Sequence, residues 1–320
     1  MTNFTLLKRP KDSSGVAAFS VVRNEMYFLP HLLRHYRALG ISDFWFLDDR
    51  STDGTREYLL QQADCGVLQA DRAFGEMVGD QRFGIVARTL VPQAFLRNRW
   101  VLTLDADEFL VLPSQHALIE DLAKALDAAG LRSARALMLD FFPLTLRDIP
   151  ESDDGRGPFE LCRHFDAFSV VDWPSGKHSP AALSRAEGVR PRMLKRLMQL
   201  KIPLGDLVTE YGFANMNKVP LNFWSEGTKM VTAHRSTEAP SDQVQLVLAH
   251  FKFFPGYRAR IADALSTKAY WQQSIEYRFL DIAVRSFANT DLRGPRSRQF
   301  TSAGDLEAAG MLFSQLKAAV

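Results

Sequence analysis

Cysteine is scarce in this chain, which has only Cys65 and Cys162 among its 320 residues. The two lie far apart, and neither has a second ligand at metal-binding spacing. A disulfide framework and a cysteine-rich metal site are therefore excluded, and a reducing compartment is favoured.

A charge excess of either sign is also missing. The chain carries 39 Lys plus Arg against 37 Asp plus Glu. A dedicated nucleic-acid binder usually shows a clear basic excess, so we expect no nucleic-acid partner. With 46% hydrophobic and 24% charged residues the chain is not disordered, and its length suits one large domain or two smaller ones.

Long apolar runs are absent as well. No stretch approaches the roughly 18 uninterrupted apolar residues of a membrane span. The N-terminus lacks the apolar core of a secretory signal. We therefore expect a cytoplasmic protein that can still touch the inner face of the cell membrane.

The first 145 residues alternate between short apolar runs and amphipathic segments. Strands are predicted at 16–22, 44–47, 67–68, 100–104 and 135–140, and helices at 28–40, around 57–60, at 80–96 and at 116–129. Strands apolar on both faces and separated by helices indicate an α/β fold with a mostly parallel central sheet flanked by helices. Further strands are expected at 218–223, 229–233 and 243–254, and helices from Tyr257 onward.

Acidic residues follow the predicted strands. Asp48, Asp49, Asp105, Asp107 and Asp140 all stand at strand ends, where ligands bind in parallel sheets. This convergence on one edge is the most informative feature of the sequence.

The motif Leu104–Phe109 (LDADEF) places two carboxylates at i and i+2 after a buried strand. On an extended backbone they point to one side and can hold a hard divalent cation, Mn²⁺ or Mg²⁺. Such a metal would neutralise a diphosphate and improve it as a leaving group. The alternative is a strand-to-loop junction with solvated acids.

The motif Leu47–Thr55 (LDDRSTDGT) joins an acidic pair to a turn rich in Ser, Thr and Gly. Its carboxylates can accept the imide N–H of uracil or ribose hydroxyls. A plain turn with a helix cap is the alternative.

Together these motifs resemble the family-2-type glycosyltransferases of GT-A fold. The order Val22-Arg23-Asn24-Glu25, then LDDRSTDGT, then LDADEF is similar to a bacterial branch with N-E, DDxSTDGT and DxDEF motifs. The resemblance covers about the first 145 residues. It implies a GT-A domain over 1–255, with a nucleotide-binding half at 14–145 and an acceptor-side half at 146–255. Residues 256–320 would form a C-terminal helical extension.

The resemblance also implies roles for single residues. Asp48 and Asp49 would contact base and ribose, and Asn24 and Glu25 belong to the same donor site. Asp105 and Asp107 would contact sugar, diphosphate and metal. His250 would be a further metal ligand, with His234 as its competitor. Lys218 and Lys252 would lie on the nucleotide sugar.

An inverting transfer, which the resemblance implies, needs a base to take the proton of the acceptor hydroxyl. Three candidates remain open: Glu210 by position in the family pattern, Asp140 by its strand-end location, and Asp172. The expected reaction moves a sugar from a nucleoside diphosphate donor, UDP-linked, to a cell-surface glycan or glycolipid precursor.

The segment 185–201 holds six Lys or Arg and one Glu. It is either a solvated helix face or a surface for diphosphate, an anionic acceptor or an anionic membrane. Two other functions are kept as alternatives. One is a haloacid-dehalogenase-type phosphatase, although Phe109 stands where Thr or Val should be. The other is a non-catalytic carbohydrate-binding protein.

Overall fold

A computed structural model of the chain describes residues 3–11, 15–167, 188–205, 207, 217–268 and 271–317. The chain divides into two compact units. The first unit comprises Met1–Ala136, Lys218–Leu248 and Phe313–Val320, and the second comprises Leu137–Asn217 and Ala249–Leu312. These bounds differ from the predicted division at residue 255, which stays a prediction about domains.

Four parallel strands form the centre of the first unit. They are β4 (Cys65–Ala70), β3 (Phe44–Asp48), β2 (Ala17–Val22) and β7 (Arg99–Leu104), paired in that order. Each pair is parallel. Their residues are almost all buried because helices cover both faces, which is why they read as continuous apolar runs. The predicted α/β class with a mostly parallel core is confirmed.

Antiparallel strands flank this parallel core. On one side β1 (Phe4–Lys8) pairs with β4, and on the other β11 (Asn217–Trp224) pairs with β7. The strand order continues from β11 through β9 (Ser133–Phe141), β12 (Val244–Phe251) and β14 (Phe313–Ser314), and β8 (Glu108–Val111) pairs with β12. A small hairpin of β5 (Met77–Val78) and β6 (Gln81–Arg82) precedes the third helix.

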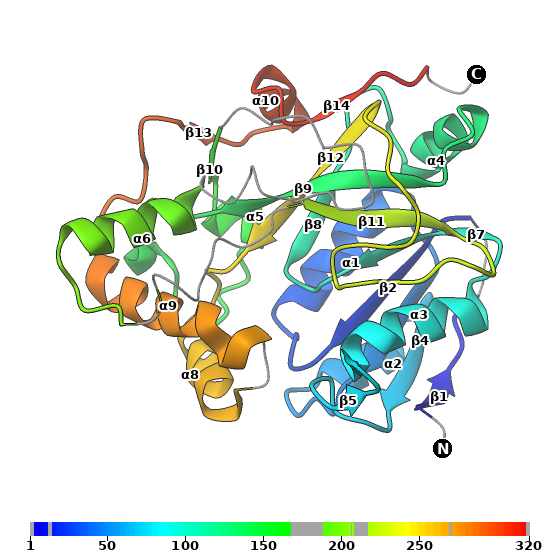
Figure 1. Ribbon diagram of the computed structural model, residues 1–320, viewed down its shortest axis with the longest axis horizontal. Coiled ribbons are helices and arrows are strands. Elements are labelled where there is room, and N and C mark those ends of the chain that lie inside the picture. Colours follow the sequence, from blue (N-terminus) through cyan, green and yellow to red (C-terminus); the bar gives the residue numbers. More distant parts are fainter. Residues whose placement is uncertain are drawn as a thin grey trace. The chain divides into compact units, whose positions relative to one another are not determined.

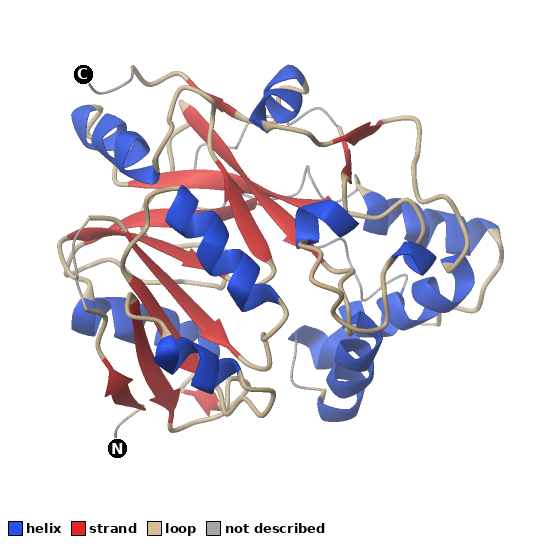
Figure 2. Ribbon diagram, turned by 180° about the vertical axis from the view of Figure 1, so that it is seen from behind, coloured by secondary structure: helices blue, strands red, loops and turns tan. Residues whose placement is uncertain are grey.

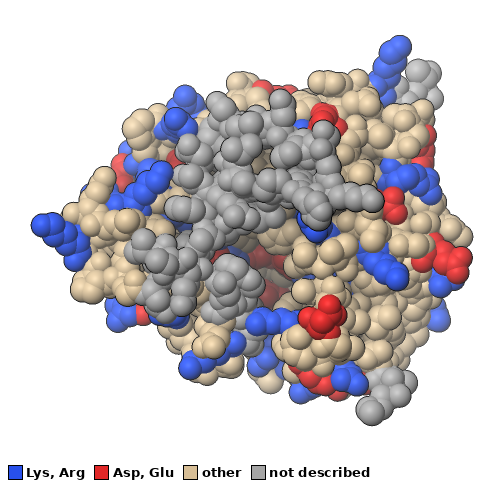
Figure 3. Space-filling view, in the orientation of Figure 1, with Lys and Arg blue, Asp and Glu red and all other residues tan. Residues whose placement is uncertain are grey.

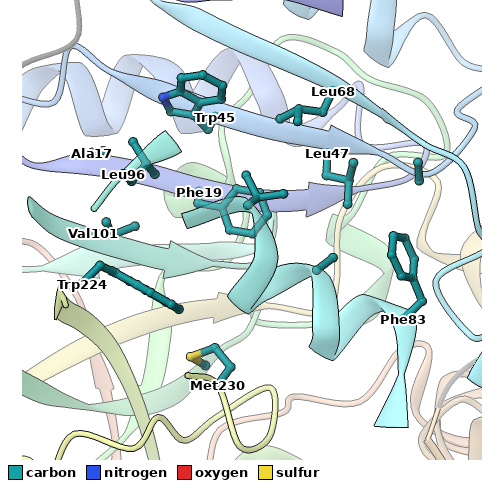
Figure 4. Close-up of a cluster of buried hydrophobic side chains, with 13 residues drawn as sticks. Ala17, Phe19, Trp45, Leu47, Leu68, Phe83, Leu96, Val101, Trp224 and Met230 are labelled. Atoms are coloured by element: carbon teal, nitrogen blue, oxygen red, sulfur yellow. The ribbon is translucent and has the colours of Figure 1, made fainter. Parts of the chain in front are cut away.

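Helices cover the parallel strands of the first unit on both faces. Helix α3 (Phe83–Phe95) lies over the strands in Figure 1, whereas α1 (Phe28–Ala38) and α2 (Thr55–Gln61) lie behind them and come to the front in Figure 2. Helix α4 is Ile119–Ala128. Between α3 and the sheet, Phe19, Trp45 and Trp224 pack into a core that is at most 3% exposed (Figure 4). This core fixes the strands whose ends carry the acidic motifs.

The second unit is mainly helical. Its helices are α5 (Pro158–Leu161), α6 (Val189–Gln199), α8 (Tyr257–Thr267), α9 (Trp271–Phe287) and α10 (Ala303–Ala308), with a 3₁₀ turn at Leu146–Asp148. Strands β10 (His164–Asp166) and β13 (Ser297–Gln299) pair antiparallel. Phe141 is surrounded by the rings of Phe159, Phe165, Phe251 and Phe300, at centroid distances of 5.2 to 5.8 Å.

Several predicted elements need correction. The strand expected at 229–233 is wrong: Thr232 Oγ1 accepts hydrogen bonds from His234 N and Arg235 N, and such local bonds compete with a strand ladder. The helix expected from Asp80 begins at Phe83, after the β5–β6 hairpin. The helix expected from His116 begins at Ile119, where Asp121 Oδ2 accepts a bond from Leu118 N. The C-terminal extension contains β13 and β14 besides its helices.

Two further observations concern possible membrane spans and the distribution of surface charge. No helix in the described ranges is both long enough and apolar enough to cross a membrane. On the face shown in Figure 3, basic and acidic side chains are interspersed, as the nearly balanced composition leads one to expect.

Candidate active site

The two acidic motifs reach the same edge of the first unit's sheet. Asp48 ends β3 and lies level with Val22 in β2. On the other side of β2, Leu104 at the end of β7 pairs with Ser20. Asp105 follows Leu104 directly, so Asp48 and Asp105 both stand at carboxyl ends of parallel strands that pair with β2. Asp140, expected at a strand end as well, lies inside β9 and in the second unit.

The loops after β2 and β3 are tied to each other by hydrogen bonds. Three of these bonds run from backbone N–H groups of the first loop to side-chain oxygens of the second: Asn24 N to Ser51 Oγ at 3.0 Å, Glu25 N to Thr55 Oγ1 at 2.8 Å, and Met26 N to Asp53 Oδ2 at 3.0 Å. In return Thr52 N donates to Asn24 Oδ1 at 2.8 Å. The bonds fix the two loops as one platform.

Two residues of this platform adopt the left-handed region of backbone space. Asn24 has φ 55° and Arg50 has φ 59°. Such a conformation costs a non-glycine residue on the order of 1 kcal/mol or more and persists only where surrounding bonds hold it. Asn24, which the family resemblance assigns to the donor site, therefore also holds the platform together.

Asp48 and Asp49 are buried beneath the platform. Asp48 Oδ1 accepts a bond from Ser51 N at 3.2 Å, while its Oδ2 has no hydrogen-bond donor among the described residues. Asp49 Oδ2 accepts a bond from Phe74 N at 3.2 Å. Burial raises the pKa of Asp49, and the bond from Phe74 only partly offsets that effect. These two buried carboxylates are part of the candidate site.

The motif after β7 is the centre of a cluster of four charges: Arg88, Asp105, Glu108 and Lys218. We call it the DxDE cluster after the motif Asp105–Glu108, although Asp107 is not one of the four. Lys218 Nζ donates to Asp105 Oδ2 at 3.1 Å and to the two Glu108 oxygens at 2.8 and 2.6 Å. Arg88 on α3 donates to Asp105 Oδ1. Glu108 Oε2 in turn accepts a bond from Asp105 N at 2.9 Å, which closes the turn.

The cluster is buried except at Asp105. Lys218 and Glu108 have side chains that are 0% and 1% exposed, whereas Asp105 keeps 35%. Burial alone would raise the pKa of Asp105, but Arg88 and Lys218 outweigh it and hold that pKa well below its usual range. Asp105 therefore stays charged and fixed at the surface of the site.

The sequence did not single out Arg88. Its side chain is 2% exposed, and Nε and Nη1 have no hydrogen-bond acceptor among the described residues. An arginine inside an otherwise apolar helix face was the only available signal, because charged residues are rarely buried without a partner. Lys218 shares Asp105 with Arg88 and has Glu108 as a second carboxylate partner.

Asp107 and His234 lie in the same unit as the DxDE cluster. Asp107 stands in the turn between β7 and β8 and is partly exposed. The backbone oxygen of His234 accepts a bond from Val219 N at 2.9 Å, one residue from Lys218. Of the two candidate histidine ligands, His234 is the one whose backbone adjoins this cluster.

The second unit holds its own buried charges. Asp140 on β9 accepts two bonds from Arg190 on α6, at 2.6 and 2.9 Å, and Arg190 also donates to Glu276 on α9. His250 Nδ1 on β12 lies 2.8 Å from Asp140 Oδ1. Because a carboxylate only accepts, Nδ1 is the hydrogen-bond donor in this contact.

These contacts determine the protonation of Asp140 and Glu276 in the second unit. Burial would raise the pKa of Asp140, but Arg190 and His250 outweigh it, so its pKa lies well below the usual range. Burial would likewise raise the pKa of Glu276, which Lys252 and Arg190 lower instead. Asp140 is thus a poor proton acceptor. The other two base candidates, Glu210 and Asp172, lie outside the described residues.

A divalent cation fits the residues present at the motif after β7. Asp105 and Asp107 are partly exposed oxygen donors in one turn, and a carboxylate has about four acceptor positions, more than Arg88 and Lys218 use. Mg²⁺ commonly binds through one or two carboxylates and substrate phosphates. Within the described ranges no group of three or more His, Cys, Asp or Glu forms a metal site.

No family model and no curated protein matches this chain. Among solved structures, S. aureus TarS is 16% identical at a TM-score of 0.31, over 87% of this chain and 44% of that one. UDP-glucose pyrophosphorylase from Acinetobacter baumannii is 12% identical at 0.24, over 85% and 100% of the two chains. A 4-diphosphocytidyl-2C-methyl-D-erythritol synthase is 14% identical at 0.26, over 45% and 66%. The chain thus spans less than half of TarS, and likeness at these TM-scores assigns it neither a family nor an activity.

Proposed function

We propose that this chain is a metal-dependent glycosyltransferase that moves a sugar, with inversion, from a UDP-linked donor to a cell-surface glycan or its precursor. The observation that carries the proposal is the DxDE cluster at the carboxyl edge of parallel strands. It holds a partly exposed carboxylate between two buried cations beside a preformed loop platform. The resemblance of the motifs to family-2-type glycosyltransferases points to the same reaction.

The formal charges of the cluster suit a diphosphate with a metal. Arg88 and Lys218 cancel Asp105 and Glu108, so Asp107 is the surplus negative charge. A sugar diphosphate would add two more negative charges next to Asp107, and like charges repel at short range. A divalent cation removes that repulsion. When bound between Asp105 and Asp107, Mn²⁺ or Mg²⁺ would also stabilise the charge that develops on the leaving diphosphate.

The chain's own residues have separate tasks in this proposal. Arg88 and Lys218 keep Asp105 ionised and oriented. The platform of Asn24 and Ser51 positions the nucleoside above Asp48 and Asp49. Asp140 orients His250, which stays the candidate for the further metal ligand with His234 as its alternative, since metal-binding histidines usually donate one N–H to a carboxylate.

The acceptor proton needs a base other than Asp140. Arg190 and His250 bind both oxygens of that carboxylate and lower its pKa, so it accepts a proton poorly. Glu210 and Asp172 therefore stay the candidates. If one of them is the base, Glu210→Gln or Asp172→Asn should abolish transfer to the acceptor while leaving donor affinity within about twofold. Loss of transfer in neither variant would remove both from the proposal.

The donor and metal can be tested by thermal shift and by donor hydrolysis. UDP-sugars should raise the melting temperature only with Mn²⁺ or Mg²⁺ present, because a ligand that binds the native state stabilises it by mass action. Asp107→Ala should abolish metal-dependent hydrolysis of the UDP-sugar while the protein stays folded. Asp263→Asn, an exposed aspartate on α8, is the matched control and should keep full activity.

Other results would favour the alternatives. Undiminished hydrolysis by Asp107→Ala, or in excess chelator, would rule out the metal mechanism. Phosphate release from sugar phosphates with a trapped adduct at Asp105 would support the phosphatase. Binding of glycans without any nucleotide-dependent shift would support a carbohydrate-binding protein.

Membrane contact through the basic segment is a second part of the proposal. The described basic residues of this segment fall into two groups: Arg190 and Arg192 bond inward to Asp140 and Asp166, while Lys195, Arg196 and Lys201 are exposed. Beside the exposed group, Met198 and Leu200 are 48% and 56% exposed. Exposed apolar side chains flanked by basic ones favour an anionic membrane surface.

Sedimentation with lipid vesicles tests this contact. Vesicles of phosphatidylcholine with 30% phosphatidylglycerol should bind the protein, and Met198→Ser with Leu200→Ser should weaken that binding. Met77→Ser is the control, because Met77 is 56% exposed in the first unit. Equal loss in the control, or equal binding to pure phosphatidylcholine, would contradict the proposed contact.

A further inference from the structure

A cavity of about 540 Å³ lies within the second unit, among residues to which no role in the proposed reaction is given. Its walls come from the end of β10, from β13 and from α10, which can be followed in Figure 1. Volumes of this order hold small organic ligands. The cavity is therefore large enough for a sugar or a small organic acid.

Two arginines line the cavity from one strand. Arg298 lies in β13, and Arg296 precedes that strand but continues its ladder, because Ala167 N donates to Arg296 O at 2.9 Å. Residues at i and i+2 of a strand share a face, about 6.6 Å apart. Both side chains belong to exposed residues, so a ligand in the cavity can reach them from solvent.

The opposite face of the same ribbon has an internal task. Ser297 Oγ donates to Asp166 Oδ1 at 2.6 Å, and Arg192 on α6 binds that same carboxylate at 2.6 and 2.9 Å. Ser297 and Asp166 thereby anchor the ribbon to the second unit. Arg296 and Arg298, one residue before and one after Ser297, lie on the other face of an anchored strand, so their backbone is held in place.

Among the described residues that line the cavity, Asp305 is the acidic one, and its carboxylate is engaged elsewhere. Asp305 Oδ2 accepts bonds from Thr301 N at 2.6 Å, Thr301 Oγ1 at 2.7 Å and Ser302 N at 2.9 Å, and so caps the first turn of α10. The rest of the wall is small or neutral and includes Gln299, Ala308 and Ala309. Two arginines and one aspartate are thus the charged residues among the described lining.

We propose that this cavity binds a small anionic ligand, whose carboxylate or phosphate group is held by Arg296 and Arg298. Guanidinium groups match both acids through paired hydrogen bonds. The small side chains of Ala308 and Ala309 leave room for a ligand body of about the size of one sugar ring. The site takes no part in the donor chemistry and stands independently of the proposed transfer reaction.

Calorimetric titration of the full chain tests the site. The probes are D-glucuronate, glucose 6-phosphate, inorganic phosphate and neutral D-glucose. At least one of the three anions should bind, neutral glucose should not, and added NaCl should weaken binding. Preference for glucuronate identifies a carboxylate ligand, and preference for either phosphate identifies a phosphorylated one.

Variants assign the binding to the arginines. Arg296→Gln and Arg298→Gln should each weaken it about tenfold or more, the loss expected for one charge-assisted hydrogen bond. Arg293→Gln removes the same charge from an exposed arginine that pairs with Asp291 and does not line the cavity, so it should change the affinity less than twofold.

Three results would overturn the site: binding of none of the anions, equal binding of neutral glucose, or a loss in Arg293→Gln as large as in the other two variants. Melting temperatures of all three variants are measured alongside. Ala308→Leu adds a test that leaves the charge unchanged. It narrows the cavity at a residue that is exposed on α10, and it should weaken binding while the helix persists.

Discussion

Replacing Lys218 with methionine tests the DxDE cluster most directly. The lysine side chain is 0% exposed, and its ammonium contacts Asp105 and both oxygens of Glu108. Methionine keeps most of the volume and removes the charge. Glu108, which is 1% exposed, then loses its counter-ion inside the protein.

The expected loss of unfolding free energy is about 3–5 kcal/mol, the usual cost of leaving one member of a buried ion pair uncompensated. A protein with about 5–15 kcal/mol of total stability would lose a large part of it. The double variant Lys218→Met with Glu108→Gln removes both charges. It should recover at least about 2 kcal/mol, because neutral replacements of buried pairs are often tolerated.

Acid should narrow the difference between the wild type and Lys218→Met. In the wild type, burial of Asp105 is outweighed by Arg88 and Lys218, so its pKa lies well below the ordinary value of 3.8. A carboxyl with a lowered folded-state pKa contributes stability above its ordinary pKa and loses that contribution as the pH falls. Lys218→Met gives up part of this contribution, so the two proteins should converge as the pH falls below the ordinary value of 3.8 toward the lowered pKa of Asp105.

Urea denaturation followed by tryptophan fluorescence measures these effects, in EDTA to keep metal away from Asp105. Trp45, Trp100 and Trp224 all report on the first unit. Lys229→Met, an exposed lysine of the same unit, should change stability by less than about 0.5 kcal/mol. A loss below about 1 kcal/mol in Lys218→Met, or a double variant no more stable than Lys218→Met, would refute the reasoning.

Three further predictions concern other parts of the chain. Gly84→Ala would place a methyl group 2.1 Å from the Phe74 ring, so it should cost about 1–3 kcal/mol, whereas Gly227→Ala enters open space and should be neutral in thermal unfolding. Arg190→Lys loses the paired bonds to Asp140 and should lower the melting temperature of the second unit, as followed by hydrogen exchange, whereas Arg293→Lys at the surface should not. Burial raises the pKa of both thiols, so Cys65 and Cys162 should react with a thiol reagent at pH 8 only after unfolding, and stability should fall as the pH rises above about 8.5. That alkaline fall should be smaller in Cys162→Ala, and rapid labelling of the native protein would contradict the buried state of the thiols.

The central elements could be predicted from the sequence because their burial pattern is local. Strands β2, β3 and β7 are buried on both faces and appear as unbroken apolar runs. Strand β1 was missed because it is an edge strand with alternating exposure. Strand β8 is hidden in the sequence because its first two residues, Glu108 and Phe109, belong to the acidic motif and only two apolar residues follow them.

The candidate site could be predicted only in part. Strand ends locate Asp105 because position along a strand is a local property. The partners of Asp105 are not local: Arg88 lies 17 positions away on a helix and Lys218 lies 113 positions away. No local sequence pattern reveals such pairings, because they depend on how the strands are ordered in the sheet. For the same reason Asp140 could be read as a free strand-end acid, whereas Arg190, 50 positions later, occupies both its oxygens.

The hydrogen bonds between the two loops of the platform place different requirements on the two loops. The loop after β3 supplies the side-chain oxygens of Ser51, Asp53 and Thr55, whereas the loop after β2 supplies mainly backbone N–H groups. Substituting Met26 leaves its N–H in place, but inserting one residue before Asn24 shifts all three donors out of register. The loop after β3 therefore depends on the identity of its side chains, and point mutations should disrupt it. The loop after β2 depends on its length, and insertions should disrupt it.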